Sequence, residues 1–70
     1  MYASVPEDTR NEIFTVIDTP KKIEEIARAL NLSKRKTGAY LRLLSKKGEI
    51  RQIPDFKDLR SFYYVINSNR

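Results

Sequence analysis

The strongest constraint on the fold lies in residues 31–48, where a polar turn leads into a stretch with one apolar and one basic side. Asn31-Leu32-Ser33 has the residue types of a tight turn that caps the next helix, and Gly48 is suited to ending one. At helical spacing, the side that is expected to be buried carries Thr37, Tyr40, Leu41 and Leu44. The opposite side carries cations. The segment therefore predicts a helix that packs on one side and presents positive charge on the other.

Charge is distributed unevenly along the chain, whose formal net charge is +5. Residues 1–30 carry four cations and six acids, whereas residues 31–70 carry ten cations and three acids. No Asp or Glu occurs between Ile26 and Gly48. Such asymmetry indicates a face that meets a polyanion, and a solvated lysine-rich surface is the alternative.

The residue types disfavour catalysis. The chain contains neither Cys nor His, which removes thiolate metal sites, disulfides and the commonest general base. The Ser, Thr and Lys residues form no nucleophile–base motif, and no glycine-rich phosphate loop occurs. We therefore expect no enzymatic activity, no catalytic or metal-binding residues, no cofactor and no small-molecule ligand.

Targeting signals are equally sparse. The opening residues 1–4 lack the basic and apolar regions of a signal peptide, and no apolar run approaches the length of a membrane span. The expected location is therefore the cytoplasm, in association with the nucleoid, without contact to a membrane.

Two further helices are predicted before the basic segment. Ser4 to Glu7 has the pattern of a capping box, and Thr19-Pro20 is a helix stop because the residue before a proline avoids the helical region. A second apolar stripe follows at helical spacing from Ile23 to Leu30. Helices are thus expected over about residues 5–18, 23–30 and 34–47.

After Gly48 the apolar period changes to two, which predicts a pair of strands. Strands are expected over about residues 49–54 and 60–67, joined as a hairpin. In the second strand, Phe62, Tyr64 and Ile66 share one face, which is expected to be well buried. Tyr63 and Val65 share the outer face. The pattern as a whole predicts a single domain over residues 1–70, of the α+β class and mostly helical.

This order of elements resembles the winged helix-turn-helix DNA-binding superfamily, in particular its small bacterial and archaeal transcriptional regulators. Residues 23–33 are similar to the first motif helix and turn of that superfamily. Leu32-Ser33, Thr37, Leu41, Leu44, Gly48 and Ile50 have the spacing of its second helix and of the entry to its wing. Residues 62–66 are similar to its returning wing strand. The resemblance covers about residues 7–66 and implies a three-helix unit with a C-terminal β-hairpin wing.

The resemblance implies that the helix of residues 34–47 enters the major groove and that the wing at residues 55–60 lies on the backbone or in the minor groove. Arg35 is the expected base contact, because it is exposed early in the helix and its guanidinium fits guanine O6 and N7. The residues expected to contact nucleic acid are Ser33, Lys34, Arg35, Lys36, Gly38, Ala39, Arg42, Lys46, Lys57 and Arg60.

Several of these residues have an alternative role. Ser33 can bind a phosphate at the helix N-terminus or cap the helix, and the two roles are compatible. Gly38 either lets the helix approach the groove floor or packs closely against the preceding helix. Phe56 and Leu59, beside the wing cations, are expected to fold back onto the core.

The expected function is sequence-specific or semi-specific binding of duplex DNA by a transcriptional regulator. An adaptor for another protein and an RNA-binding winged helix remain alternatives, because one fold serves several functions. A homodimer is a further expected assembly, and its candidate surfaces are the N-terminal helix with Phe14 and the outer wing face with Tyr63 and Val65.

Overall fold

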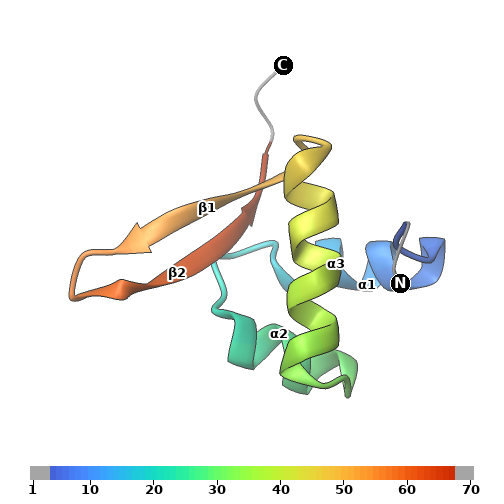
Figure 1. Cartoon of the computed structure of the whole chain (residues 1–70), viewed down its shortest axis with the longest axis horizontal. Helices are drawn as coiled ribbons and strands as arrows, with labels where there is room; N and C mark the ends of the chain where they lie inside the picture. The colour runs from blue at the N-terminus through green and yellow to red at the C-terminus, as the bar shows by residue number, and fades with distance from the viewer. Residues whose placement is uncertain (1–3, 68–70) are drawn as a thin grey trace.

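In a computed structural model of the chain, residues 4–67 are described. Three helices, α1 (Glu7–Val16), α2 (Ile23–Leu30) and α3 (Lys34–Lys46), are followed by strands β1 (Ile50–Asp55) and β2 (Asp58–Ile66). The strands form an antiparallel hairpin that extends away from the helices, while α1 and α2 lie behind α3 (Figure 1). This is the predicted α+β winged helix-turn-helix architecture, and the fold class is confirmed.

The hydrophobic core lies where the three helices meet the base of the hairpin. Each element up to β1 contributes buried side chains: Ile13 and Ile17 from α1 and its end, Ile26 from α2, Tyr40, Leu41 and Leu44 from α3, and Ile50 from β1. Thr37 is also fully buried, as the spacing of α3 predicts. One side of α3 is therefore fixed in the core, which leaves the opposite side for solvent or a partner.

The capping box predicted at Ser4 is wrong. The first helix begins at Glu7, its N-cap is Pro6, and no side chain caps it. The reason is that Val5 precedes a proline and is pushed out of the helical region, so the helix cannot include it. Instead, the carbonyl oxygen of Pro6 accepts the first helical hydrogen bond from the Arg10 N–H at 2.9 Å.

The turn between α2 and α3 is built by local chemistry that the sequence indicates. Asn31 adopts a left-handed conformation with φ of 57°, and the Ser33 Oγ accepts a hydrogen bond from the Lys36 N–H at 3.0 Å. Gly48 ends the following turn with φ of 76°. The N-cap of α2 is Lys22, whose side chain has no acceptor for a helix N–H. The Glu25 carboxylate accepts a hydrogen bond from the Lys22 N–H at 3.1 Å and ties the start of the helix to its first turn.

The hairpin, called the wing from here on, is longer and more tightly turned than predicted. Its strands enclose a loop of only Phe56 and Lys57, since Asp55 pairs with Asp58. Two-residue hairpin loops usually need a positive φ, which neither loop residue has. Here the Asp55 carboxylate accepts a hydrogen bond from the Lys57 N–H at 2.9 Å and closes the turn.

Apolar residues of the wing are more exposed than the alternation predicts. Phe62 and Ile66 are 42% and 39% exposed, so the expectation that their strand has one well-buried face is wrong. Phe56 and Leu59 do not fold back either, and their exposures are 82% and 69%. For Phe56, Leu59 and Phe62 the physical reason is reach, because the wing runs outward beyond the helices (Figure 1). Ile66 lies at the base of the wing, where it pairs with the buried Ile50, so reach does not account for its exposure.

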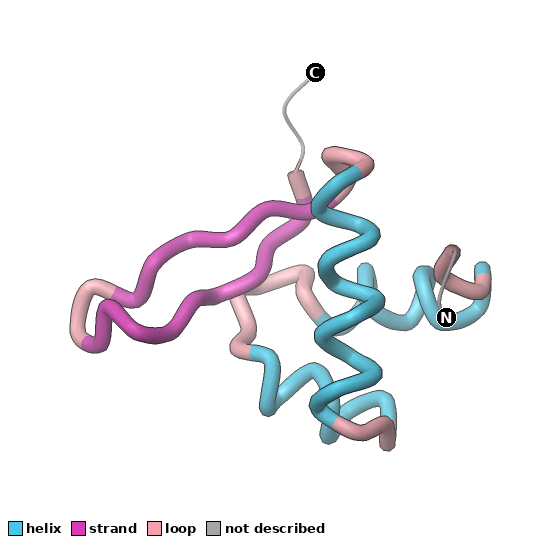
Figure 2. The backbone as a smooth tube through the Cα atoms, in the orientation of Figure 1, coloured by secondary structure: helices cyan, strands magenta, loops and turns pink. Residues whose placement is uncertain are grey.

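The segment between α1 and α2 pairs with the wing. Lys21 and Tyr64 form an isolated antiparallel bridge, in which the Tyr64 N–H donates to the Lys21 carbonyl at 2.7 Å and the Lys21 N–H donates to the Tyr64 carbonyl at 3.3 Å. Figure 2 shows this link running beside the hairpin. The wing is thus fixed to the helices through its second strand as well as through Ile50.

Glu49 and Asp55 should make the stability of the fold sensitive to acid, and Glu24, whose ion pair is more than half exposed, should add little to this effect. The Arg10 guanidinium lowers the pKa of Glu49, Lys34 lowers the pKa of Glu24, and Lys22 with the Lys57 N–H lowers the pKa of Asp55. A carboxyl whose pKa is depressed on folding stabilises the fold above its ordinary value and ceases to do so as the pH falls through the folded pKa.

We therefore expect the melting temperature to be flat down to about pH 5 and to fall below the ordinary values of 4.5 for Glu and 3.8 for Asp. Circular dichroism melts between pH 7 and pH 2 measure this. The Asp55→Asn variant should show a shallower decline than the wild type. A profile identical in the two proteins would contradict the role of Asp55.

No helix among residues 4–67 is both long enough and apolar enough to cross a membrane.

Candidate nucleic-acid interface

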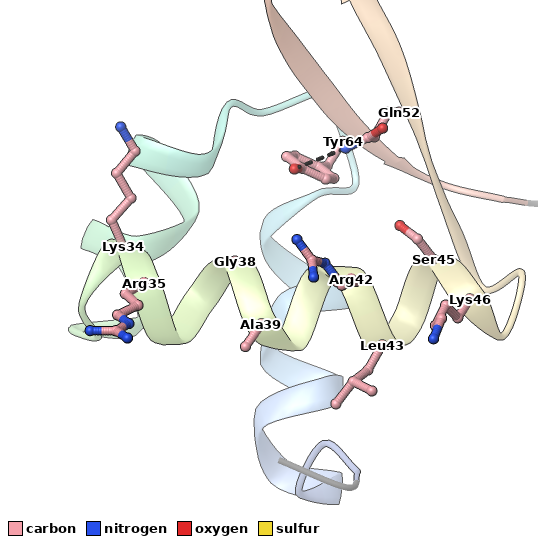
Figure 3. A pocket seen from close by; sticks show the side chains of 10 residues that line it. All are labelled: Lys34, Arg35, Gly38, Ala39, Arg42, Leu43, Ser45, Lys46, Gln52 and Tyr64. Atoms are coloured by element: carbon pink, nitrogen blue, oxygen red, sulfur yellow. Dashed lines mark hydrogen bonds between the residues drawn. The ribbon is translucent and has the colours of Figure 1, made fainter. Parts of the chain in front are cut away.

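A groove of about 890 Å³ lies between the outer side of α3 and the wing. The helix contributes most of its lining, and Gln52 and Tyr64 supply the side formed by the wing (Figure 3). The residues from α3 are Lys34, Arg35, Gly38, Ala39, Arg42, Leu43, Ser45 and Lys46. Six residues predicted from the sequence to contact nucleic acid are therefore gathered on one surface.

The cations on this surface have different surroundings. Arg35, Arg42 and Lys46 are exposed, and none of them forms an ion pair with another residue of the described part of the chain. Arg42 points from α3 toward Gln52 and Tyr64, while Arg35 lies near the start of the helix (Figure 3). Two guanidinium groups and an ammonium group are thus available to an anionic ligand.

Lys34 is less free than the sequence predicts. Its Nζ lies 3.0 Å from the Glu24 Oε2, and this contact is the largest cause of the lowered pKa of Glu24. Both side chains are more than half exposed, so the pair is screened by water and contributes little to stability. A phosphate contact by Lys34 would have to share the ammonium group with Glu24.

Gly38 faces α2 as well as the groove. A Cβ atom added at Gly38 would lie 3.4 Å from the Ile23 Cδ1, an ordinary van der Waals contact. Packing against α2 therefore does not require a glycine at this position, and the contact does not decide between the packing role of Gly38 and close approach to a ligand. The geometry also leaves room for a methyl group.

We expect Gly38→Ala to stabilise the fold by up to about 1 kcal/mol, because a glycine inside a helix is that much less favourable than alanine. A thermal melt should show a rise of several degrees. Ala39→Gly is the reciprocal control and should lower the melting temperature by a similar amount. A fall in melting temperature for Gly38→Ala would show that Ile23 cannot give way.

Four residues of the groove are absent from the sequence-based prediction: Leu43 and Ser45 of α3, and Gln52 and Tyr64 of the wing. Gln52 and Tyr64 are paired across the two strands, and the Gln52 Nε2 donates a hydrogen bond to the Tyr64 hydroxyl at 3.2 Å. An amide and a phenol in this position can donate hydrogen bonds to phosphate oxygens. Alternation along each strand indicates which face Gln52 or Tyr64 occupies. That the two side chains are neighbours depends on the register between the strands, which the sequence does not give.

Four predicted contact residues lie outside the groove. Ser33 caps α3, so its helix-capping role is confirmed, and Lys36 lies in the first turn of that helix, half-exposed. Lys57 and Arg60 are exposed at the wing tip. The Asp58 carboxylate accepts hydrogen bonds from the Arg60 N–H at 3.2 Å and from its Nε at 3.3 Å. The cations therefore fall into a groove set and a tip set.

The two surfaces expected to support a homodimer are partly occupied. Phe14 packs against the core, and the Arg10 guanidinium lies 4.6 Å from the centre of its ring. The Lys22 ammonium lies 5.3 Å from the centre of the Tyr63 ring, and Val65 is half-buried. Neither surface is an open apolar face within the described residues.

Solved structures confirm the architecture. The adhesin competence repressor AdcR from Streptococcus pyogenes superimposes with a TM-score of 0.79 at 17% identity, over 91% of this chain and 47% of that one. The MepR G34K mutant from S. aureus gives 0.78 at 18% identity, over 91% and 49%. The heme sensor protein PefR from Streptococcus agalactiae gives 0.72 at 18% identity, over 89% and 44%.

The likeness to these structures concerns the fold. This chain spans less than half the length of each of these three proteins. A search of curated protein sequences gives no match.

Comparison with models of protein families identifies the family of this chain. A family model described as FaeA-like protein matches residues 9–66, which run from α1 to the end of the wing. The matched region includes the whole of α3, the groove and the wing tip. The chain therefore belongs to the FaeA-like protein family.

Proposed function

We propose that this chain binds duplex DNA as a transcriptional regulator of the cytoplasm and nucleoid, and that it has no enzymatic activity. In this proposal α3 enters the major groove, and the wing at residues 55–60 lies on the backbone or in the minor groove. Arg35 contacts base edges, while Arg42 and Lys46 neutralise phosphates. A homodimer would double the contacted sequence and is part of the same proposal.

The observation that carries the proposal is the exposed side of α3. The core holds the opposite side of this helix through Thr37, Tyr40, Leu41 and Leu44. The outward side is thereby fixed in direction, and its Arg35, Arg42 and Lys46 lack acidic partners among residues 4–67. A rigid helix with such a side suits the major groove, which is about 12 Å wide and admits one helix.

The groove between α3 and the wing supports the same proposal. One strand of the DNA backbone can pass through it while α3 lies in the major groove, since the wing then stands on the other side of that strand. Gln52 and the Tyr64 hydroxyl offer donors on the wing side, and Arg42 offers a guanidinium on the helix side. These are the groups that commonly bind phosphate oxygens.

The test is fluorescence anisotropy with labelled random duplex DNA at salt concentrations between about 50 and 200 mM. Saturable binding whose log K falls steeply with log salt is expected. Absence of binding at the lowest salt would refute the proposal. A pull-down that recovers a protein partner, or tighter binding to RNA than to duplex DNA, would favour the adaptor or the RNA-binding alternative in that case.

Lys46 gives a separate prediction within the same assay. Lys46→Ala should weaken binding to all duplexes alike and reduce the slope of log K against log salt by about one unit, because one phosphate contact is lost. Lys21→Ala, which removes an ammonium group outside the groove, is the matched control and should leave the slope unchanged. An unchanged slope for Lys46→Ala would place this lysine away from the DNA.

A further inference from the structure

The wing tip exposes two large apolar side chains where hairpin turns usually carry small or polar residues. Phe56 and Leu59 are 82% and 69% exposed, the two highest values among the exposed large hydrophobic residues of the described chain. A single exposed apolar residue is ordinary on a protein surface. Here Phe56 lies in the two-residue loop and Leu59 is the second residue of β2, so two exposed apolar side chains stand at the outer end of the wing and are called the apolar projection.

The turn that carries this projection is held in place by side chains. The Asp55 carboxylate accepts the Lys57 N–H through Oδ1 at 2.9 Å and pairs through Oδ2 with the Lys22 Nζ at 2.8 Å. Asp55 is itself only 8% exposed, although it lies near the tip. Phe56 therefore follows an anchored residue, and its ring is presented by an ordered turn.

Lys57 and Arg60 are exposed beside the two apolar residues. The tip also carries two acids, Asp55 and Asp58, which pair with Lys22 and Arg60. Lys57 is therefore the tip cation without an ion pair among residues 4–67, while Arg60, whose side chain is 94% exposed, would exchange Asp58 for a phosphate. An apolar pair flanked by a lysine and an arginine suits the minor groove, where cations follow the phosphates and apolar side chains meet the bases.

The reach of the wing fits the same ligand. Ile50 is buried under α3, and five residue steps separate it from Asp55. At ~3.3 Å per residue this is roughly 17 Å of strand. The minor groove lies about half of a 34 Å helical turn, also roughly 17 Å, from the neighbouring major groove. The strand is therefore long enough for the tip to reach the adjacent minor groove when α3 lies in the major groove.

We propose that the wing tip is an apolar wedge, in which Phe56 and Leu59 enter the minor groove, partly unstack one base step and kink the duplex toward the major groove. Lys57 and Arg60 contact phosphates on either side of that step. This inference rests on the proposed DNA binding. It adds a source of sequence preference, because pyrimidine–purine steps such as TA unstack far more readily than the stiff steps of an A-tract.

The test uses the 70-residue chain and two duplexes of equal length and base composition, one with repeated TA steps and one with an A-tract. Fluorophores at the two ends report bending by energy transfer, and 2-aminopurine in the TA duplex reports unstacking. The key variant is Phe56→Ala with Leu59→Ala, which leaves the core intact because both side chains are largely in solvent. Phe56→Leu keeps an apolar tip, and Lys57→Ala removes only a charge.

We expect the wild type to bend the TA duplex, raise the 2-aminopurine signal and prefer this duplex over the A-tract. The double variant should bind the TA duplex about tenfold more weakly, without bending and without that preference. Phe56→Leu should retain bending, and Lys57→Ala should lose affinity at low salt but still bend the DNA.

Other outcomes overturn the wedge. If the wild type binds DNA without bending or unstacking, or if the double variant bends it equally, the inference is wrong and the proposed DNA binding stands. If no duplex binds at all, the proposed function fails and the wedge fails with it. If sedimentation shows a dimer that the double variant dissociates, the tip is an interface between copies of the chain.

Discussion

Replacing Arg35 by alanine is expected to weaken binding to the preferred duplex by about 1–3 kcal/mol, or roughly 5- to 150-fold. The guanidinium lies near the N-terminal end of α3, on the side that the core fixes outward, and it has no ion-pair partner within residues 4–67. If it forms two hydrogen bonds to one guanine, its loss also relaxes the preference at that base position. Competition binding against a panel of single-position duplex variants measures both effects.

Two further variants separate charge from geometry. Arg35→Lys keeps the charge but not the planar fork, so it should retain affinity for random DNA and lose the preference. Arg28→Ala removes an exposed arginine of α2 that does not line the groove, and it should change neither quantity by more than about twofold. Equal affinities of Arg35→Ala and wild type for every duplex would show that α3 does not dock as proposed.

Replacing Leu44 by alanine is expected to cost about 2–5 kcal/mol of the free energy of unfolding. Leu44 is fully buried, and it lies in the core cluster with Ile13, Ile26 and Ile50. A chain of 70 residues has a stability of only a few kcal/mol, so the variant should be close to half unfolded at 25 °C. Urea titration followed by circular dichroism should show a lower midpoint with an unchanged slope.

The matched control for this variant lies on the wing. Leu59→Ala makes the same chemical change at a side chain that is 69% exposed, and it should alter stability by less than about 0.5 kcal/mol. A cost below about 1 kcal/mol for Leu44→Ala would mean that α3 is not packed as described. In that case the core would not hold the outward side of α3 in a fixed orientation for binding a ligand.

The elements that sequence predicts well are those that short-range chemistry decides. The α2–α3 turn follows from Asn31, which tolerates a positive φ, and from Ser33, whose hydroxyl caps the next helix. The buried side of α3 follows from helical spacing alone. The wrong prediction of a capping box at Ser4 also has a local cause. The residue types fit a capping box, but the steric effect of Pro6 on the preceding residue prevents the helix from starting there.

The wing is harder to predict because burial there depends on position relative to other elements. Alternation correctly separates two faces of β2, but it cannot tell that Phe62 lies beyond the end of the helical core. Phe56 and Leu59 were expected on the core for the same reason, since a large apolar side chain is usually buried. The distance that a hairpin projects is a tertiary property.

In the candidate interface, too, the sequence predicts the positions that local spacing decides and misses those that depend on tertiary structure. Helical spacing places Arg35, Arg42 and Lys46 on one side of α3, and the structure brings all three to the groove. Gln52 and Tyr64 were missed, because their shared position depends on strand register and on how the wing lies against α3. Their roles, like those of the cations, remain predictions for the binding assays.

The pairing of Lys21 with Tyr64 has a consequence for the order of folding. The helices and the α2–α3 turn rest on contacts between near neighbours in sequence, whereas this bridge joins residues toward opposite ends of the chain. Closing so long a loop is slow, and we expect it to follow helix formation. During synthesis α3 would therefore form before the wing is anchored beside it. Tyr64→Ala keeps the backbone bridge but removes the side chain that packs against the core beside it. A folding φ-value near zero for this variant would show that the proposed surface for DNA is completed last.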